Sequence, residues 1–315
     1  MVHVGVVEQR RPGLMTEQLA IGRLATGRLA TERLATGLVP GPVDFQVLLP
    51  DGYASGTEAY PLLLCLHGGL GGQDLMQQLC PLVQEMGTLA GMVIVAPRAG
   101  HSFYLDYRDG SQRWETFLVV ELLPHIRSRY RICPDRSLVA GISMGGMGAL
   151  RLGLKYPDVF GAIVAWEPSI EPALTWADVK LEDRFWRSDE MLQVRFGQPL
   201  DEAYWAVNNP ASLAATQAEA IRSSGIRIYL EAGSDDVYGL HRGAEFLHRT
   251  LYDHGIPHEY RTVLGADHIG PTIVPRLRDG LAFIARLLCP DPPDPKVRLL
   301  RDLVAVQKRR AGITS

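Results

Sequence analysis

The chain has 315 residues, 46% of them hydrophobic, which is enough for one large α/β domain or two small ones. A formal net charge of −3 gives no electrostatic basis for binding nucleic acid or a membrane surface. The sequence holds no run of about 18 apolar residues, and Glu8, Arg10 and Arg11 interrupt its N-terminus, so we expect neither a transmembrane helix nor a signal peptide.

Residues 1–40 are expected to be a leader that ends in a possible first strand. Within it, Arg-Leu-Ala-Thr occurs at residues 23, 28 and 33. A period of five fits neither helix nor strand, so Leu24, Leu29 and Leu34 cannot stay on one face. The repeat is also too short for a solenoid.

From residue 43 onward, short apolar runs alternate with longer amphipathic segments. This pattern is typical of a mainly parallel sheet covered by helices on both faces. The expected strands are 43–49, 61–66, 92–96, 137–140, 162–166, 226–231 and 259–263, and the expected helices are 73–89, 114–130, 241–253 and 271–288. We therefore predict one α/β domain over residues 41–289.

Residues 167–216 contain no clear strand, and we interpret them as a cap-like insertion over the carboxyl edge of the sheet. Its large aromatic side chains are expected to face a cleft or a core: Trp176, Phe185, Trp186 and Trp205. The tail, 290–315, opens with a proline-rich segment and continues as a basic amphipathic stretch over 296–310. For this stretch we favour packing or an oligomer contact over a membrane or nucleic-acid role.

The four cysteines show no paired spacing: Cys65, Cys80, Cys133 and Cys289. We read them as reduced thiols in a cytoplasmic protein. No His/Cys cluster with metal-ligand spacing is present, so neither a metal nor a cofactor is expected.

The most informative motif is Gly141-Ile142-Ser143-Met144-Gly145. It lies between an apolar strand and a helical run, which is the context of a nucleophile elbow. Glycines are needed there because strand and helix approach too closely for a Cβ atom. The N–H groups at the helix start are available to an oxyanion.

A serine nucleophile needs a base and an acid that orients the base. Downstream of Ser143, Asp235 and Asp236 follow the strand 226–231, and His268 follows the strand 259–263. This is the chain order Ser, acid, His, and each group lies at the carboxyl end of a strand. Only one of the two adjacent aspartates can point at His268, and Asp267 is too close to it in sequence.

His67, in His67-Gly68-Gly69-Leu70, follows the strand 61–66. This position supplies an oxyanion-hole N–H group in such sheets. We expect the His67 ring to order the loop while the backbone does the chemistry. The other histidines fall in helices and turns and are expected to be solvated or structural.

Together these motifs resemble the esterase D-like esterase family of the α/β-hydrolase superfamily, which includes S-formylglutathione hydrolases and tributyrin-type esterases, with mycolyltransferases as distant relatives. The resemblance runs from about Phe45 to Leu288. Its further pieces are Val47-Leu48-Leu49-Pro50, Ser102-Phe103-Tyr104-Leu105-Asp106, Tyr204-Trp205 and Asn208-Asn209-Pro210.

The resemblance implies an α/β-hydrolase fold with antiparallel N-terminal strands and a serine carboxylesterase acting on small, short-chain acyl esters. It implies Asp236 as the acid and oxyanion donors from the backbone of Leu70 and Met144. Ile142 stands where formylglutathione enzymes carry a histidine, and Leu-Gly-Gly follows Gly69 in place of Leu-Thr-Cys. Three alternatives stay open: an acyltransferase with the same triad, a formylglutathione-type thioesterase, and a non-catalytic binding protein on the same fold.

Overall fold

The computed structural model describes residues 28–69, 73–292 and 294–313. The strands are β1 (Arg28–Leu34), β2 (Val43–Leu49), β3 (Leu62–Leu66), β4 (Val93–Pro97), β5 (Ser137–Ile142), β6 (Phe160–Trp166), β7 (Arg227–Gly233) and β8 (Glu259–Val263). The helices are α1 (Gln73–Glu85), α2 (Trp114–Thr116), α3 (Leu123–Arg129), α4 (Met144–Lys155), α5 (Asp189–Phe196), α6 (Glu202–Ala206), α7 (Pro210–Thr216), α8 (Ala218–Ser224), α9 (Leu240–Asp253), α10 (Ile273–Leu288) and α11 (Pro295–Arg310), with short turns η1 (Thr88–Gly91), η2 (Phe117–Leu122), η3 (Trp176–Asp178) and η4 (Leu181–Asp183).

All these strands form one sheet in the order β1-β2-β4-β3-β5-β6-β7-β8. β2 runs antiparallel to both β1 and β4, whereas the strands from β4 to β8 are mutually parallel. The predicted α/β fold with its mainly parallel sheet is confirmed. Every residue of β3 and β4 is buried, as expected for strands with helices on both faces.

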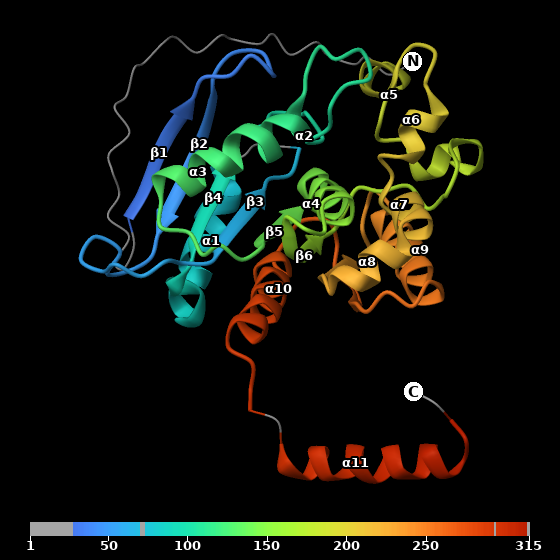
Figure 1. Cartoon of the computed structure of the whole chain (residues 1–315). Coiled ribbons are helices and arrows are strands. Elements are labelled where there is room, and N and C mark those ends of the chain that lie inside the picture. Colours follow the sequence, from blue (N-terminus) through green and yellow to red (C-terminus); the bar gives the residue numbers. More distant parts are fainter. Residues whose placement is uncertain (1–27, 70–72, 293, 314–315) are drawn as a thin grey trace.

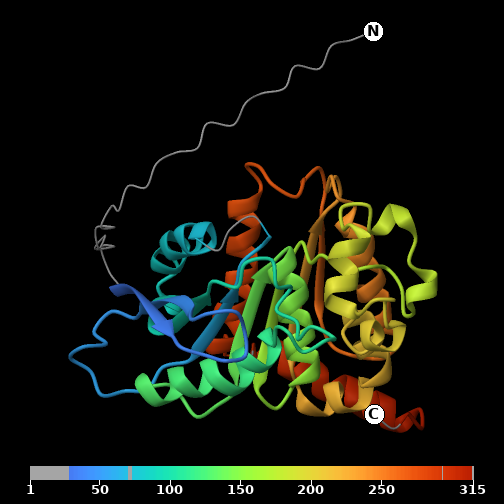
Figure 2. The same ribbon diagram turned by 90° about the horizontal axis from the view of Figure 1, so that it is seen from above.

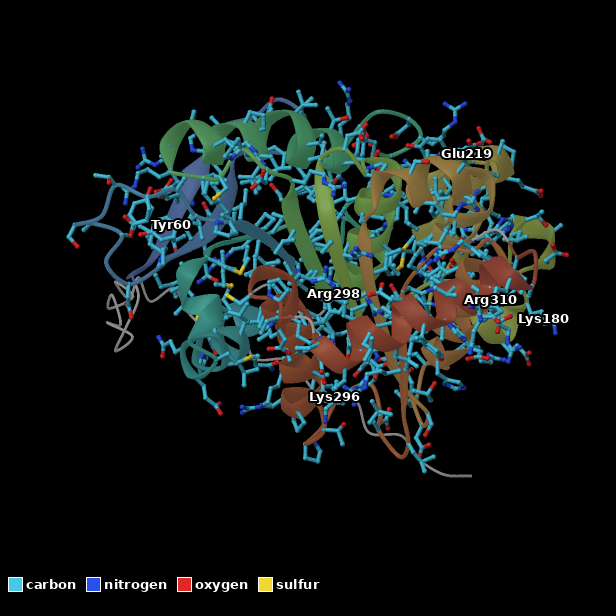
Figure 3. All side chains as sticks on the ribbon, turned by 60° about the horizontal axis from the view of Figure 1, so that its bottom comes forward. Tyr60, Lys180, Glu219, Lys296, Arg298 and Arg310 are labelled. Atoms are coloured by element: carbon cyan, nitrogen blue, oxygen red, sulfur yellow. The ribbon has the colours of Figure 1, made fainter. Side chains whose placement is uncertain are left out.

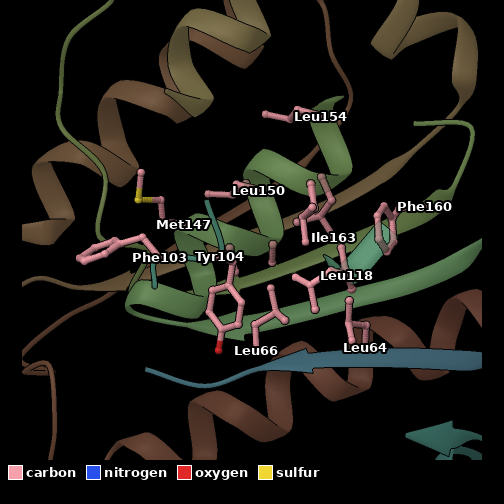
Figure 4. Packing of buried hydrophobic residues seen from close by; sticks show 14 of the residues in the cluster. Leu64, Leu66, Phe103, Tyr104, Leu118, Met147, Leu150, Leu154, Phe160 and Ile163 are labelled. Carbon is pink, nitrogen blue, oxygen red and sulfur yellow. The ribbon is translucent and has the colours of Figure 1, made fainter. Parts of the chain in front are cut away.

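Helices cover the two faces of the sheet unequally (Figures 1 and 2). One apolar cluster joins α1 and α10 to the sheet, and a larger one joins the opposite face to α3, α4, α7 and α9. Leu150 and Leu154 of α4 and Ile163 of β6 belong to the larger cluster, part of which is drawn in Figure 4. This packing fixes the start of α4, and with it the end of β5.

Two predicted helices differ in detail. The segment 73–89 ends as α1 at Glu85 and resumes as η1, because Gly87 adopts a left-handed φ of 53° that stops the helix. The segment 114–130 is helical from α2 to α3 but contains the π-helical turn η2.

The repeat at 23–37 lies partly in β1, and the sheet explains the part that is described. Successive strand residues point to opposite faces, so residues five apart also do. Leu29 accordingly packs against the cluster under α1 and α10, whereas Leu34 packs against the opposite cluster. Residues 1–27, which include Leu24, lie outside the described residues.

The segment 167–216 contains only helices and turns, from η3 to α7. Trp205 is 1% exposed and meets Trp176 edge to face, with ring centroids 5.5 Å apart, so these two rings form a core within the segment. Phe185 is 57% exposed, contrary to expectation, because it lies two residues after η4, a surface turn whose Leu181 is also exposed. The cap role of the segment stays a prediction.

Helix α11 follows the proline-rich linker and stands away from the sheet (Figure 1). Its leucines Leu299, Leu300 and Leu303 are at least 54% exposed. Lys296, Arg298 and Arg310 are spread along the same helix (Figure 3). The expected oligomer contact stays a prediction. Within the described residues, no helix is both long and apolar enough to cross a bilayer.

Candidate active site

Ser143 sits in a strained turn between β5 and α4. Its φ of 56° and ψ of −117° lie where non-glycine residues are rare. A Cβ on Gly141 would lie 2.2 Å from the carbonyl oxygen of Gly145, and one on Gly145 would lie 2.0 Å from that of Leu66. Both flanking glycines are therefore required for this close approach of strand and helix.

Three side chains from three strand ends meet at this turn. His268 Nε2 lies 3.1 Å from Ser143 Oγ, and His268 Nδ1 lies 2.8 Å from Asp236 Oδ2. Asp236 follows β7, and His268 follows β8. A hydroxyl beside an imidazole whose other nitrogen faces a carboxylate is the arrangement for nucleophilic attack on an acyl carbon.

Of the two aspartates that the sequence left open, Asp236 contacts the histidine. Its Oδ1 accepts hydrogen bonds from the backbone of Tyr238 (2.8 Å) and Leu240 (3.3 Å), which fix the carboxylate. Asp235 is exposed and accepts instead from the Ser234 hydroxyl. Asp267 accepts from the backbone N–H groups of Val237 and His268 and so joins the two loops.

The two expected oxyanion donors differ in what the structure describes. Met144 is the first residue of α4, so its N–H group has no acceptor within the helix. Leu70 lies outside the described residues. The His67 ring accepts from Ala99 N–H at 3.0 Å and donates to Gly68 C=O at 2.7 Å, and burial lowers its pKa. The neutral ring thus orders the loop, as expected.

Two neighbours of His268, Tyr238 and Glu167, were not singled out from the sequence. The Tyr238 ring meets the His268 ring edge to face at 5.0 Å, and Trp186 meets Tyr238 at 6.3 Å. Glu167 follows β6 directly, at the same edge of the sheet as Ser143. The rule that found Asp236, a polar residue at the carboxyl end of a strand, could have found Glu167 too.

In the described part of the chain, one group has the spacing of a metal site: Glu167, Asp236 and His268, with ligand atoms within 4.8 Å of one another. Asp236 and His268 already bond each other, and His268 also faces Ser143. We therefore assign the Asp236 and His268 atoms to the hydroxyl–imidazole–carboxylate array.

Comparison with known proteins gives one family match and several relatives. A family model described as "Putative esterase" matches residues 38–269. Esterase Rv1288 of Mycobacterium tuberculosis is 30% identical over 265 residues, which cover 77% of this chain and 56% of that protein. The chain thus spans about half the length of this curated relative.

Two solved structures share the fold. An S-formylglutathione hydrolase from Agrobacterium tumefaciens matches with a TM-score of 0.69 and 20% identity, over 86% of this chain and 99% of the other. A ferulic acid esterase matches with a TM-score of 0.67 and 22% identity, over 84% and 99%. At these identities the structures show the α/β-hydrolase fold and no more.

Proposed function

We propose an activity for this chain on the basis of its family. The chain belongs to the esterase family, whose model covers most of its length. We propose that it is a serine carboxylesterase in which Ser143 is the nucleophile, His268 the base and Asp236 the orienting acid. The observation that carries the proposal is the continuous contact from Ser143 Oγ through the imidazole to Asp236 Oδ2.

In the first step, Ser143 Oγ attacks the ester carbonyl carbon while His268 Nε2 takes the hydroxyl proton. Asp236 holds the tautomer that leaves Nε2 free and stabilises the imidazolium. The imidazolium then protonates the departing alkoxide, which leaves an acyl group on Ser143. In the second step, His268 takes a proton from water, and the resulting attack releases the carboxylic acid. The Met144 N–H group, with that of Leu70, would receive the oxyanion in both steps.

Labelling with a fluorophosphonate tests the nucleophile directly. Wild-type protein should be labelled at Ser143 and should hydrolyse p-nitrophenyl acetate. Ser143→Ala, which removes only one oxygen, should lose labelling and about three or more orders of magnitude in kcat. An unlabelled wild-type protein would favour the non-catalytic alternative. A dominant transfer product with added alcohol would favour the acyltransferase.

We also propose a preference for short acyl chains. Trp186 supports it, because its contact with Tyr238 brings a large ring to the His268 side of the site. A methylene that fits gains ~0.8 kcal/mol, whereas one that does not meets strain of ~1–3 kcal/mol. Values of kcat/KM on acetyl, butyryl, octanoyl and palmitoyl esters decide between a closed and an open pocket. A maximum at octanoyl or longer contradicts the proposal.

For compartment and assembly, we propose a cytoplasmic protein that self-associates through α11. The four free cysteines support a reducing compartment. The exposed leucines of α11 support a contact between copies. Light scattering on the full chain and on a chain ending at Cys289 tests this, since only the full chain should form oligomers.

A further inference from the structure

Glu167 occupies an unusual backbone position beside the catalytic serine. Its φ is 45°, in the left-handed region, and its side chain is completely buried. Its N–H donates to the Glu231 carbonyl at 2.9 Å, while the Trp166 carbonyl just before it accepts from Ser143 N–H at 2.8 Å. A glutamate persists in this conformation only where the surroundings hold it, which is common at functional sites.

One arginine beside Glu167 donates hydrogen bonds to two buried carboxyl groups. Arg276 of α10 donates to both carboxylate oxygens of Glu231, at 2.6 Å each, and also to Glu167 Oε1. Its remaining Nη1 donates to the Asp267 carbonyl at 2.8 Å, next to His268. One guanidinium thus contacts Glu231, Glu167 and the loop that carries His268.

The Glu167 carboxyl group also lies beside Asp236 and His268. Oε1 also accepts from Gly233 N–H at 3.1 Å, whereas Oε2 is buried and has no hydrogen-bond partner among the described residues. A Glu167 oxygen, an Asp236 oxygen and a His268 ring nitrogen all lie within 4.8 Å of one another. At such a distance a carboxylate favours the charged form of an imidazole.

We propose that Glu167 is a positioning residue that tunes His268, stabilising its imidazolium when Ser143 gives up its proton. This inference rests on the proposed esterase function. The charged groups around the imidazole are Asp236, bonded to Nδ1, and Glu167, with Arg276 behind Glu167. The Asp267 carboxylate accepts from the backbone N–H of His268, at 2.6 Å. Glu231, near Arg261 and Asp279, lies beyond the arginine.

The test is Glu167→Gln, which keeps a side-chain oxygen for Arg276 and Gly233 and removes the charge. Loss of a nearby negative charge makes the imidazolium less stable, so it loses its proton at lower pH. The midpoint of the acid limb of kcat/KM should fall by about one pH unit, and the plateau by about tenfold, since one unit is a factor of ten in the stability of the cation. NMR titration of the His268 ring should show the same downward shift.

Glu231→Gln is the matched control, because it replaces the other carboxyl group on the same arginine but lies outside the 4.8 Å group. It should move the midpoint by less than about 0.3 units, as the nearby charge is kept. Glu167→Asp, which keeps the charge one methylene further away, should move it by an intermediate amount and serves if Glu167→Gln does not fold.

An unchanged midpoint in both Glu167 variants, or an equal shift in Glu231→Gln, overturns the inference, since either result reduces Glu167 to a structural role. The NMR titration needs no substrate. Absence of ester turnover would therefore overturn the proposed function, while the histidine shift would still decide the role of Glu167.

Discussion

Gly145→Ala should lower both the stability and the activity of the protein, because the structure leaves no space for the new methyl group. Its Cβ would lie 2.0 Å from the Leu66 carbonyl oxygen, where ordinary contact begins at 3.4 Å. The end of β3 and the start of α4 must therefore separate by about 1.4 Å, judged from these contacts. Overpacking of this kind costs ~1–3 kcal/mol, and the better helix propensity of alanine offsets up to ~1 kcal/mol.

The catalytic effect should exceed the loss of stability. Gly145 is two residues from Ser143, and Leu66 precedes the His67 loop, so the separation moves Ser143 relative to the proposed oxyanion donors. A misplacement of ~1 Å costs ~10²-fold in rate. The assay is kcat on p-nitrophenyl acetate, with urea unfolding in parallel. Gly37→Ala is the control, since its Cβ meets nothing within 4 Å. If Gly145→Ala keeps more than about a third of the activity, the steric reasoning is wrong.

Three further results are expected. Asp236→Asn should lower kcat by ~10³-fold or more, and Asp235→Asn should leave it nearly unchanged, since only Asp236 bonds the imidazole; the reverse order would make Asp235 the acid. The kcat/KM of the wild type should rise with pH through one ionisation, because only a neutral imidazole accepts the serine proton; a flat profile between about pH 5 and 9 contradicts the mechanism. Burial opposes ionisation of Glu115, but Arg151 and Lys155 outweigh it and lower its pKa. This stabilisation is complete above the unfolded value of ~4.3 and is lost as pH falls through the folded one. Glu115→Gln should therefore lower the free energy of unfolding by ~3 kcal/mol at pH 7, and the difference from wild type should shrink below about pH 4 in denaturant titrations.

The sequence predicted the parallel part of the fold well because those strands are buried on both faces. The runs 61–66 and 92–96 contain almost no polar side chain, and β3 and β4 match them within one residue at each end. The antiparallel strand β1 was harder to find. It lies at the sheet edge with partly exposed residues, so its pattern is weaker than that of a central strand.

The residues of the candidate site that belong to a sequence motif or a strand end were predicted. Contacts that only the folded chain brings together were missed. Ser143 and His268 followed from the elbow and the strand ends, whereas the choice between Asp235 and Asp236 required the resemblance. The strand-end rule could have placed Glu167 at this edge of the sheet, but it could not show the contact of Glu167 with Arg276, which is 109 residues away. No local pattern reports a contact of that separation.

The spacing of the triad also determines when the site can form during synthesis. Ser143 and His268 are 125 residues apart. At ~5–20 residues per second, His268 is polymerised roughly 6 to 25 s after the serine. During that interval the nascent chain carries its nucleophile without a base. The growing polypeptide should therefore be chemically inert toward esters until β8 has left the ribosome and joined the edge of the sheet.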